Sequence, residues 1–231
     1  MGGRVLLRQY RTQPGIVDYN SGHIGIRRLG GALKRLSLII PMVALVLVLF
    51  AVGCSSGSAE AERAFNDGTD SLERGLYEEA IAYLDKAIQL DPDDAGAYLN
   101  RGVSYKELGE SQKAINDYTK VILLEPDEVQ AYLNRGWSYL LLHQFEEAIA
   151  DFDKAIQLDP NDGFTYHNRG MIYFLQGESQ KAIKDYDKAI QIEPDNARTY
   201  TLRGEVLEEF GKHDLANEDF AKACELDRSR C

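Results

Sequence analysis

Apolar residues follow two helical stripes that recur together every 34 residues along the second part of the chain. In residues 129–162 the first stripe is Tyr132, Gly136 and Tyr139, at i, i+4 and i+7. The second stripe consists of Ala148, Ile149, Phe152, Ala155 and Ile156. Such spacing places the apolar side chains on one face of a helix. The sequence therefore predicts two amphipathic helices in each 34-residue unit.

Glycine and proline mark the ends of these helices. A left-handed residue is needed where the first helix ends, and the residues at that point are Gly75, Gly109, His143, Gly177 and Gly211. The second helix ends at an Asp-Pro or Glu-Pro pair, because the residue before proline avoids helical geometry. The prolines are Pro92, Pro126, Pro160 and Pro194. The Asp and Asn residues after each proline are predicted to cap the next helix.

A period held without insertion is typical of helix pairs that stack on one another to bury a shared core. The predicted units are 61–94, 95–128, 129–162, 163–196 and 197–230. The third unit carries the residues Tyr132, Gly136, Tyr139, Ala148, Phe152, Ala155 and Pro160. This set resembles the tetratricopeptide repeat (TPR) family over about three quarters of the chain. The resemblance implies an all-α, right-handed superhelical solenoid of five antiparallel helix pairs, with the first helices lining its concave wall.

The first and last units depart from the pattern. Unit one has Ala64 and Ser71 where tyrosines are expected, and unit five has Asn217 in place of isoleucine and no proline. Terminal repeats need a polar outer face, so both units are predicted to act as caps.

The N-terminal part of the chain has the pattern of an export signal. Residues 36–52 form a run of 17 uncharged residues after Arg27, Arg28, Lys34 and Arg35. This run is shorter than the roughly 20 residues of a membrane-spanning helix. It ends in Ala51-Val52-Gly53-Cys54, which resembles the lipobox of bacterial lipoproteins.

That resemblance implies that Cys54 is acylated and becomes the first residue of the mature chain. Residues 1–53 would then be an N-terminal extension with its signal peptide, and residues 54–60 a short tether before the repeats. We expect a membrane-anchored lipoprotein of the cell envelope, facing outside the cytoplasm. An uncleaved anchor helix with an incidental cysteine is the alternative.

Charge narrows the choice of partners. Residues 1–53 hold seven of the 26 basic and one of the 37 acidic residues, which leaves 19 positive and 36 negative charges in the predicted mature chain. So acidic a surface repels nucleic acid. Cationic and neutral partners are favoured.

The two remaining cysteines lie in a predicted compartment where disulfides can form. Cys224 aligns with Ile88, Ile122, Ile156 and Ile190, which favours a small buried apolar side chain. Cys231 is seven residues further on. On a continuous helix the two would lie about 10 Å apart, too far to bridge unless the last turn unwinds.

Arginine and aspartate recur together in four units. Counting from the first residue of each unit, position 7 is Arg101, Arg135, Arg169 and Arg203, and position 23 is Asp117, Asp151, Asp185 and Asp219. Unit one loses both, with Asp67 and Tyr83. This joint pattern predicts a structural ion pair between the two helices of each unit, bidentate where geometry allows.

Catalytic patterns are not evident. The four histidines, His23, His143, His167 and His213, are scattered without metal-ligand spacing, and no phosphate loop or nucleophile motif is visible. The sequence therefore predicts a protein that is not an enzyme and holds no metal or cofactor.

Position 6 of the first helix carries a recurrent asparagine, at Asn66, Asn100, Asn134 and Asn168. The series resembles the asparagine ladder of the O-linked N-acetylglucosamine transferase, whose amides hold the backbone of an extended peptide. A carboxamide offers both a donor and an acceptor to a peptide group. The alternative is that these amides only bond a neighbouring repeat.

Apolar residues accompany this ladder on the predicted concave wall: Leu133, Trp137, Leu140, Met171 and Phe174. Some of them are expected to pack between repeats, whereas Trp137, the only tryptophan, is the expected anchor of a partner. We therefore predict a lipid-anchored adaptor that binds a protein partner as an extended peptide. Self-association through the last helix, and a small-molecule carrier or enzyme using the groove, are the alternatives.

Overall fold

The computed structural model describes residues 57–230 of the chain, and these residues form helices and turns without any strand. They belong to the second of two units into which the chain divides, Gly53–Cys231. The predicted all-α fold is confirmed. The predicted signal peptide and Cys54 lie outside the described residues.

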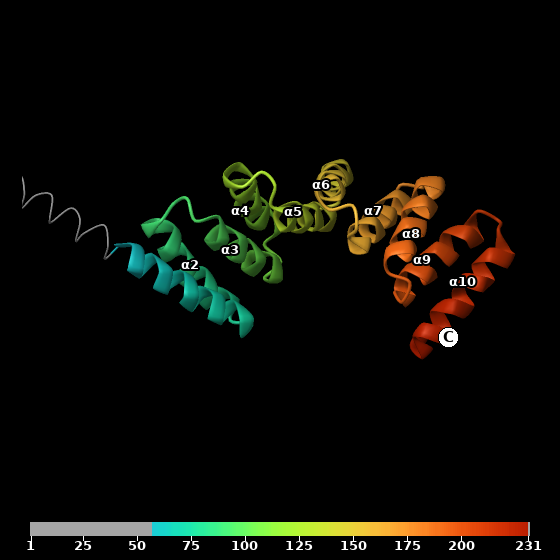
Figure 1. The fold of residues 1–231 in the computed structure, drawn as a ribbon, viewed down its shortest axis with the longest axis horizontal. Helices are drawn as coiled ribbons and strands as arrows, with labels where there is room; N and C mark the ends of the chain where they lie inside the picture. Colours follow the sequence, from blue (N-terminus) through green and yellow to red (C-terminus); the bar gives the residue numbers. More distant parts are fainter. Residues whose placement is uncertain (1–56, 231) are drawn as a thin grey trace, which may run out of the picture. The chain divides into compact units, whose positions relative to one another are not determined.

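Ten α-helices form five consecutive pairs within the described part (Figure 1). Residues 57–73 form the first helix. The others are α2 (Tyr77–Leu90), α3 (Ala95–Glu107), α4 (Ser111–Leu124), α5 (Val129–Leu141), α6 (Phe145–Leu158), α7 (Gly163–Leu175), α8 (Ser179–Ile192), α9 (Ala197–Glu209) and α10 (His213–Leu226). The 3₁₀ turn η1 (Arg228–Arg230) follows.

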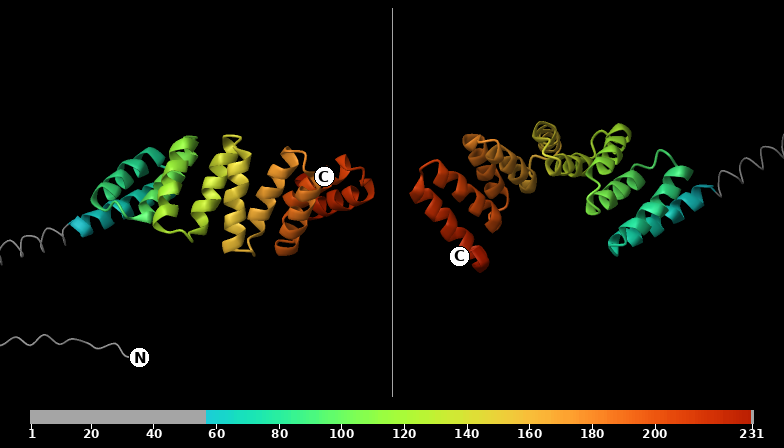
Figure 2. Two further views of the ribbon diagram at one scale, coloured as in Figure 1. Left: turned by 90° about the horizontal axis from the view of Figure 1, so that it is seen from above. Right: turned by 180° about the vertical axis from the view of Figure 1, so that it is seen from behind.

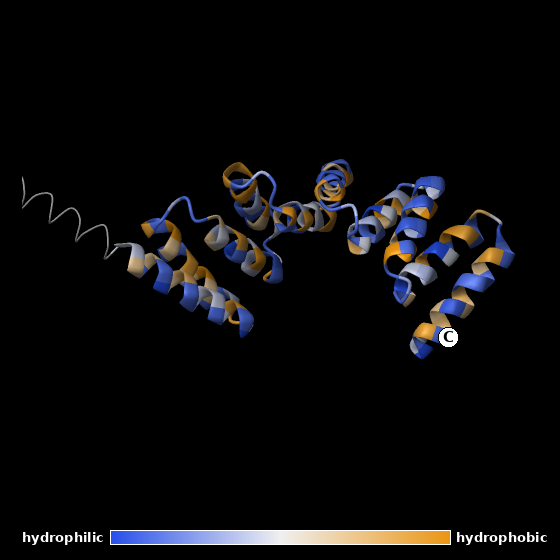
Figure 3. Ribbon diagram, viewed as in Figure 1, coloured by the Kyte–Doolittle hydropathy of each residue, from blue (hydrophilic) through white to orange (hydrophobic). Residues whose placement is uncertain are grey.

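From α2 onward each helix packs against the next one in the chain, so the pairs stack in order, as both views of Figure 2 show. In addition α3 contacts α5, and α7 contacts α9, so first helices of adjacent pairs share a surface. In Figure 3 hydrophobic and hydrophilic segments alternate along the helices, as amphipathic packing requires.

The turn within each pair has the predicted left-handed residue. Gly75, Gly109, Gly177 and Gly211 have φ of 74–76°. His143 has φ of 57° and is the only other described residue with positive φ. An L-residue tolerates this region poorly, so the glycines supply the geometry without strain, and the prediction is confirmed.

Capping of the first helices follows the prediction with one exception. Asp94, Asp162 and Asn196 each accept a hydrogen bond from a backbone N–H in the first turn of α3, α7 and α9. In α5 the cap is Glu128, whose Oε1 accepts from the N–H of Gln130 at 2.9 Å, and not Asp127. The capping residue is therefore always the second one after proline, whatever its type.

Glycine at position 8 lets the two helices of a pair approach closely. A methyl group placed on it would lie 2.6–3.0 Å from an aromatic ring of the second helix. The pairs are Gly102 with Tyr118, Gly136 with Phe152, Gly170 with Tyr186 and Gly204 with Phe220. Real side chains do not come so close, so only glycine fits beside these rings. The close approach predicted from small and large positions is confirmed.

The first helix begins within the segment 54–60 that was predicted as a tether. Residues 57–60 are helical, because the first helix begins before unit one. Glu60 Oε1 lies 2.7 Å from Lys86 Nζ on α2, and Ala61 is buried. Residues 57–60 therefore belong to the first helix, and residues 54–56 lie outside the described part.

The prediction for Cys224 is wrong, because this partly buried residue is disulfide-bonded. The predicted separation of the two cysteines applies only to a continuous helix. However, α10 ends at Leu226 and the chain turns into η1. The other cysteines, Cys54 and Cys231, lie outside the described residues.

Among residues 57–230, none of the helices has the length and apolar character of a membrane span.

Candidate functional site

An arginine clamp joins the two helices of units two to five. The Nε and Nη2 atoms of each arginine donate to the two oxygens of one aspartate, at 2.7–2.8 Å and 2.6–2.7 Å respectively. The pairs are Arg101 with Asp117, Arg135 with Asp151, Arg169 with Asp185 and Arg203 with Asp219. The predicted bidentate ion pair is thus confirmed in all four units.

The clamp also reaches into the preceding unit. The Nη1 atom of Arg101 donates to Asp85 at 2.6 Å, and that of Arg135 donates to Thr119 at 3.0 Å. Arg169 and Arg203 bond Asp153 and Asp187 in the same way. These acceptors stand at position 25 of the preceding unit, a relation missed by looking within single units. The sequence does carry a signal for this bond. Position 25 can accept a hydrogen bond in each of the four units that precede an arginine-containing unit, and it is Ala221 in unit five.

The bidentate aspartates of the clamp offer no acceptor to a ligand. The four aspartates that receive the bidentate bond are only 4–6% exposed, and both oxygens of each are bonded. The hydrogen bond that Arg135 donates to Asp151 raises the pKa of Arg135. The rings of Tyr132 and Tyr139 lie 5.9 and 5.8 Å from the guanidinium carbon of Arg135. We conclude that the clamp is structural.

A cleft of about 530 Å³ opens on a different side of the first helices, between α5 and α7. Side chains of α5 and α7 meet there with the loops that precede α7 and α9. Its lining is Lys106, Val129, Gln130, Leu133, Asn134, Trp137, Asp159, Asn161, Asp162, Phe164 and Glu193. It therefore spans parts of units two, three and four.

Two aromatic rings dominate the apolar part of the cleft. The ring centroids of Trp137 on α5 and Phe164 on α7 lie 6.3 Å apart, with a 43° angle between the ring planes. Phe164 is 44% exposed, whereas Trp137 is partly buried against the core. Leu133, 8% exposed, completes this surface. An exposed aromatic side chain in a cleft provides contact area for a partner at little entropic cost.

Acidic groups outnumber basic ones around these rings. The cleft contains the carboxylates of Asp159, Asp162 and Glu193, and the single ammonium of Lys106. Lys106 Nζ lies 3.3 Å from Glu107 and 3.4 Å from Asn134 Oδ1. Among residues 57–230, no ion pair involves any of the three carboxylates.

Three predicted site residues meet in this cleft: Leu133, Asn134 and Trp137. Asn66 is exposed on the first helix, away from them. Asn100 Nδ2 donates to Thr69 Oγ1 of the preceding unit at 3.0 Å. Asn100 thus forms a hydrogen bond between repeats, which was the alternative to peptide binding. Asn134 Oδ1 also accepts a hydrogen bond from the preceding repeat, donated by Lys106 Nζ.

The prediction that Asn168 faces the groove is wrong, because this residue is 1% exposed. Its neighbour His167 is buried too, and Nδ1 of the ring lies 2.8 Å from Thr199 Oγ1 on α9. Burial, assisted by the positive charge of Arg198, lowers the pKa of His167 to about 4. Close packing of α7 on α9 therefore closes the ladder at unit four.

Some of the predicted apolar anchors lie in the cleft, and others pack in the core. Leu140 is 7% exposed in the core, and Met171 packs against the same cluster. Phe174 packs against the cluster that contains Tyr186. These three are packing residues in the structure, as was expected for some of the set. Phe164 and Gln130 also line the cleft and were not predicted as site residues; both stand at position 2, which differs in every unit.

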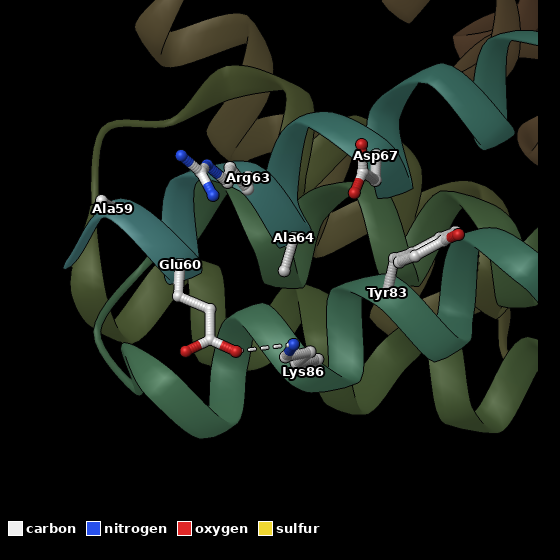
Figure 4. Close-up of a pocket in the computed structure, with 7 residues that line it drawn as sticks. All are labelled: Ala59, Glu60, Arg63, Ala64, Asp67, Tyr83 and Lys86. Carbon is white, nitrogen blue, oxygen red and sulfur yellow. Dashed lines mark ion pairs between the residues drawn. The ribbon is translucent and has the colours of Figure 1, made fainter. Parts of the chain in front are cut away.

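A second cleft of about 510 Å³ lies on unit one (Figure 4). It is lined by Ala59, Glu60, Arg63, Ala64, Asp67, Tyr83 and Lys86. In units two to five position 4 is a tyrosine and position 7 an arginine, and unit one has Ala64 and Asp67 instead. The smaller side chains account for the space. Because the cleft between α5 and α7 has the aromatic pair, we take it as the candidate site.

The stacked pairs, the clamps between them and an open cleft define an α-helical repeat protein. Tetratricopeptide repeat models match residues 95–128, 129–162 and 164–196, a TPR repeat model matches residues 71–109, and a further tetratricopeptide model matches residues 197–230. The chain belongs to the TPR family. No curated protein matches it.

Several solved structures share the fold. A crystal structure of MamA is 27% identical, covering 74% of this chain and 93% of that one, with a TM-score of 0.68. MamA from Desulfovibrio magneticus RS-1 is 26% identical over 74% and 96%, with a TM-score of 0.70. YrrB, described as a TPR protein with an unusual peptide-binding site, is 21% identical over 78% and 92%, with a TM-score of 0.66. At that identity the likeness to YrrB shows the fold alone.

Within residues 57–230 no group of three or more His, Cys, Asp or Glu side chains is arranged to hold a metal ion. The TPR architecture is that of a protein-interaction scaffold. The absence of enzymatic activity stays a prediction.

Proposed function

We propose that this chain is a lipid-anchored, extracytoplasmic TPR adaptor that binds an extended segment of a protein partner in the cleft between α5 and α7. One observation carries the choice of site. The Trp137 and Phe164 rings lie together in an open cleft, and Phe164 remains 44% exposed. Exposed aromatic side chains of this kind are typical energetic anchors of protein interfaces.

The polar residues of the cleft suit a peptide backbone. Asn134 and Gln130 lie on α5 beside the rings, and a carboxamide offers one acceptor and two donor hydrogens. A peptide group presents the matching donor and acceptor whatever its side chain is. We infer that the amides hold the backbone of the partner while Trp137, Phe164 and Leu133 receive an apolar side chain.

Site-specific photo-crosslinking tests this function. A photoreactive phenylalanine analogue at position 164 should form adducts in intact cells that map to one segment of a partner protein. The same analogue at Leu175, which is 60% exposed at the other end of α7, is the matched control. Equal adduct formation at both positions, or none at position 164, would contradict the proposed site.

Membrane anchoring rests on the sequence of the N-terminal part. The uncharged run 36–52 and the Ala-Val-Gly-Cys ending at Cys54 support acylation of that cysteine. Mass spectrometry of membrane-extracted protein should then find an acylated N-terminal peptide that begins at Cys54. The Cys54→Ala variant should lack it. A mature N-terminus upstream of Cys54 would contradict the anchor.

End-to-end self-association has less support. A second copy stacked on unit one would meet Asp67 where the other junctions have arginine. At the opposite end, position 25 is Ala221 rather than a hydrogen-bonding residue. Neither end therefore offers the groups that form a clamp between repeats. A small-molecule carrier has no specific observation in its favour.

A further inference from the structure

We propose that the segment bound in the cleft carries a lysine or arginine next to its apolar anchor, and that Asp159 and Glu193 bind this cation. The inference rests on the proposed function and specifies the chemistry of the partner. It starts from the unbalanced charge of the cleft, where three carboxylates face one ammonium.

The single ammonium does not neutralise the carboxylates. Lys106 is placed near Glu107 and Asn134, and it forms no ion pair with the acidic residues of the cleft. Asp162 is occupied otherwise, because its two oxygens bond the N–H of Phe164 and the hydroxyl of Thr165 at the start of α7. Asp159 and Glu193 are therefore the acidic groups that remain for a ligand.

Glu193 reaches the cleft because residue 163 is glycine. A methyl group on Gly163 would lie 2.8–2.9 Å from the carboxyl end of Glu193. The first position of the other units is Ala61, Ala95, Val129 and Ala197. The carboxylate thus lies over the start of α7 and lines the same cleft as the exposed ring of Phe164. Its Oε2 accepts a long hydrogen bond, 3.4 Å, from Asn196 Nδ2.

Asp159 can also accept a hydrogen bond from a ligand. Its Oδ1 accepts from the N–H of Asn161 at 3.0 Å, and the residue is exposed. Its other oxygen is available to a donor of the ligand. Charge-assisted hydrogen bonds of this kind are stronger than neutral ones, and the nearby apolar surface reduces screening by water.

The opposite chemistry is disfavoured. An acidic segment would place like charges beside Asp159 and Glu193, which costs affinity and slows association. Nucleic acid would bring its phosphates to the same carboxylates. An uncharged apolar segment would bind the rings without balancing the acidic groups. A segment with an apolar side chain and an adjacent cation satisfies both parts of the cleft.

Peptide selection tests this inference. A random peptide library displayed on phage is selected in parallel on the purified full-length chain, on the double variant Asp159→Asn with Glu193→Gln, and on Phe164→Ala. The control is Glu147→Gln, which removes an exposed carboxylate of α6 outside the cleft and so accounts for non-specific attraction to an acidic protein. The selected pools are sequenced.

Wild type and the control should enrich peptides with Lys or Arg next to an aromatic or aliphatic residue. The double variant should keep the apolar preference and lose the basic one. Because Trp137 is the only tryptophan, its fluorescence measures the affinity of a selected peptide that lacks tryptophan. We expect the double variant to weaken that affinity about tenfold, the effect of one lost charge-assisted contact.

The two possible failures are distinguishable. Apolar peptides without a basic preference on the wild type, or a basic preference that survives in the double variant, would overturn this inference and leave the proposed function intact. No enrichment on the wild type, or identical pools on wild type and Phe164→Ala, would overturn the proposed function together with it.

Discussion

The arginine clamps and the cleft between α5 and α7 both involve the first helix of each pair. Charged groups are paired at the clamps, whereas carboxylates in the cleft have no ion-pair partner among residues 57–230. At the clamps every guanidinium nitrogen that donates has an acceptor on an adjacent helix, and the bidentate aspartates are buried. In the cleft Asp159 and Glu193 have no ion-pair partner among residues 57–230, and an aromatic ring is exposed. One surface is complete without a ligand, and the other is not.

The difference follows from which positions recur along the chain. Positions 7 and 23 hold Arg and Asp in units two to five, and position 25 holds Asp or Thr in units one to four, because each junction needs the same bonds. Position 2, which supplies Gln130 and Phe164, is different in all five units. In this chain recurrence marks the groups that hold the stack together, and variation marks the surface that can be specific for a partner.

The largest expected effect comes from breaking a clamp. Asp151→Ala leaves the guanidinium of Arg135, 17% exposed, without its bidentate partner and should lower the free energy of unfolding by about 3 kcal/mol. Asp187→Ala removes an acceptor that is 56% exposed and should cost about 0.5 kcal/mol. Urea unfolding measures both. Equal losses would show that the buried pair is not special.

A matched control separates lost pairing from lost packing. Adding Arg135→Leu to Asp151→Ala removes the unpaired charge, so part of the stability should return. Strictly additive losses in this cycle would contradict the clamp.

Acid should lower the free energy of unfolding through His167, by less than the loss of a clamp. The pKa of buried His167 is lowered to about 4, below its ordinary value of 6.5, so the unfolded chain binds a proton first as the pH falls. This contribution to stability is fully present above pH 6.5 and is lost toward pH 4, about 2 kcal/mol between pH 7 and pH 5.

The comparison that isolates this effect uses His167→Gln, which can still bond Thr199 but does not titrate. Both proteins will lose stability in acid through their carboxylates. The wild type should lose more than the variant between pH 7 and pH 5, as measured by urea unfolding at each pH. Parallel curves would mean that His167 is not buried in its neutral form.

The smallest effect is expected in unit one, which lacks a clamp. Replacing Asp67 by Arg together with Tyr83 by Asp restores the residues of the other units. The new pair would lie beside the open cleft of Figure 4 and has no preceding acceptor, so we expect a gain of at most about 1 kcal/mol. Asp67→Arg alone should gain less. A loss of stability in the double variant would show that Tyr83 contributes packing that the pair cannot replace.

The sequence predicted the helix pairs, the left-handed turns and the bidentate arginines, because each depends on contacts inside one repeat. It predicted the stacking of the pairs because the 34-residue period has no insertion. It did not predict the third bond of each arginine, which crosses to position 25 of the preceding unit. It also placed Asn168 on the surface, although packing of α7 against α9 buries it. Phe164 was missed because exposure of one position depends on its neighbours in the next unit, and periodicity carries no such information.

The most direct test measures two variants in two assays. Phe164→Ala should weaken binding of a library-selected peptide by about 2 kcal/mol while the free energy of unfolding stays within about 1 kcal/mol of wild type. Asp151→Ala should do the reverse at a temperature where the variant is still folded, with stability lost and affinity retained. Unchanged affinity in Phe164→Ala, or a comparable loss of affinity in both variants, would contradict the separation of a structural clamp from a binding cleft.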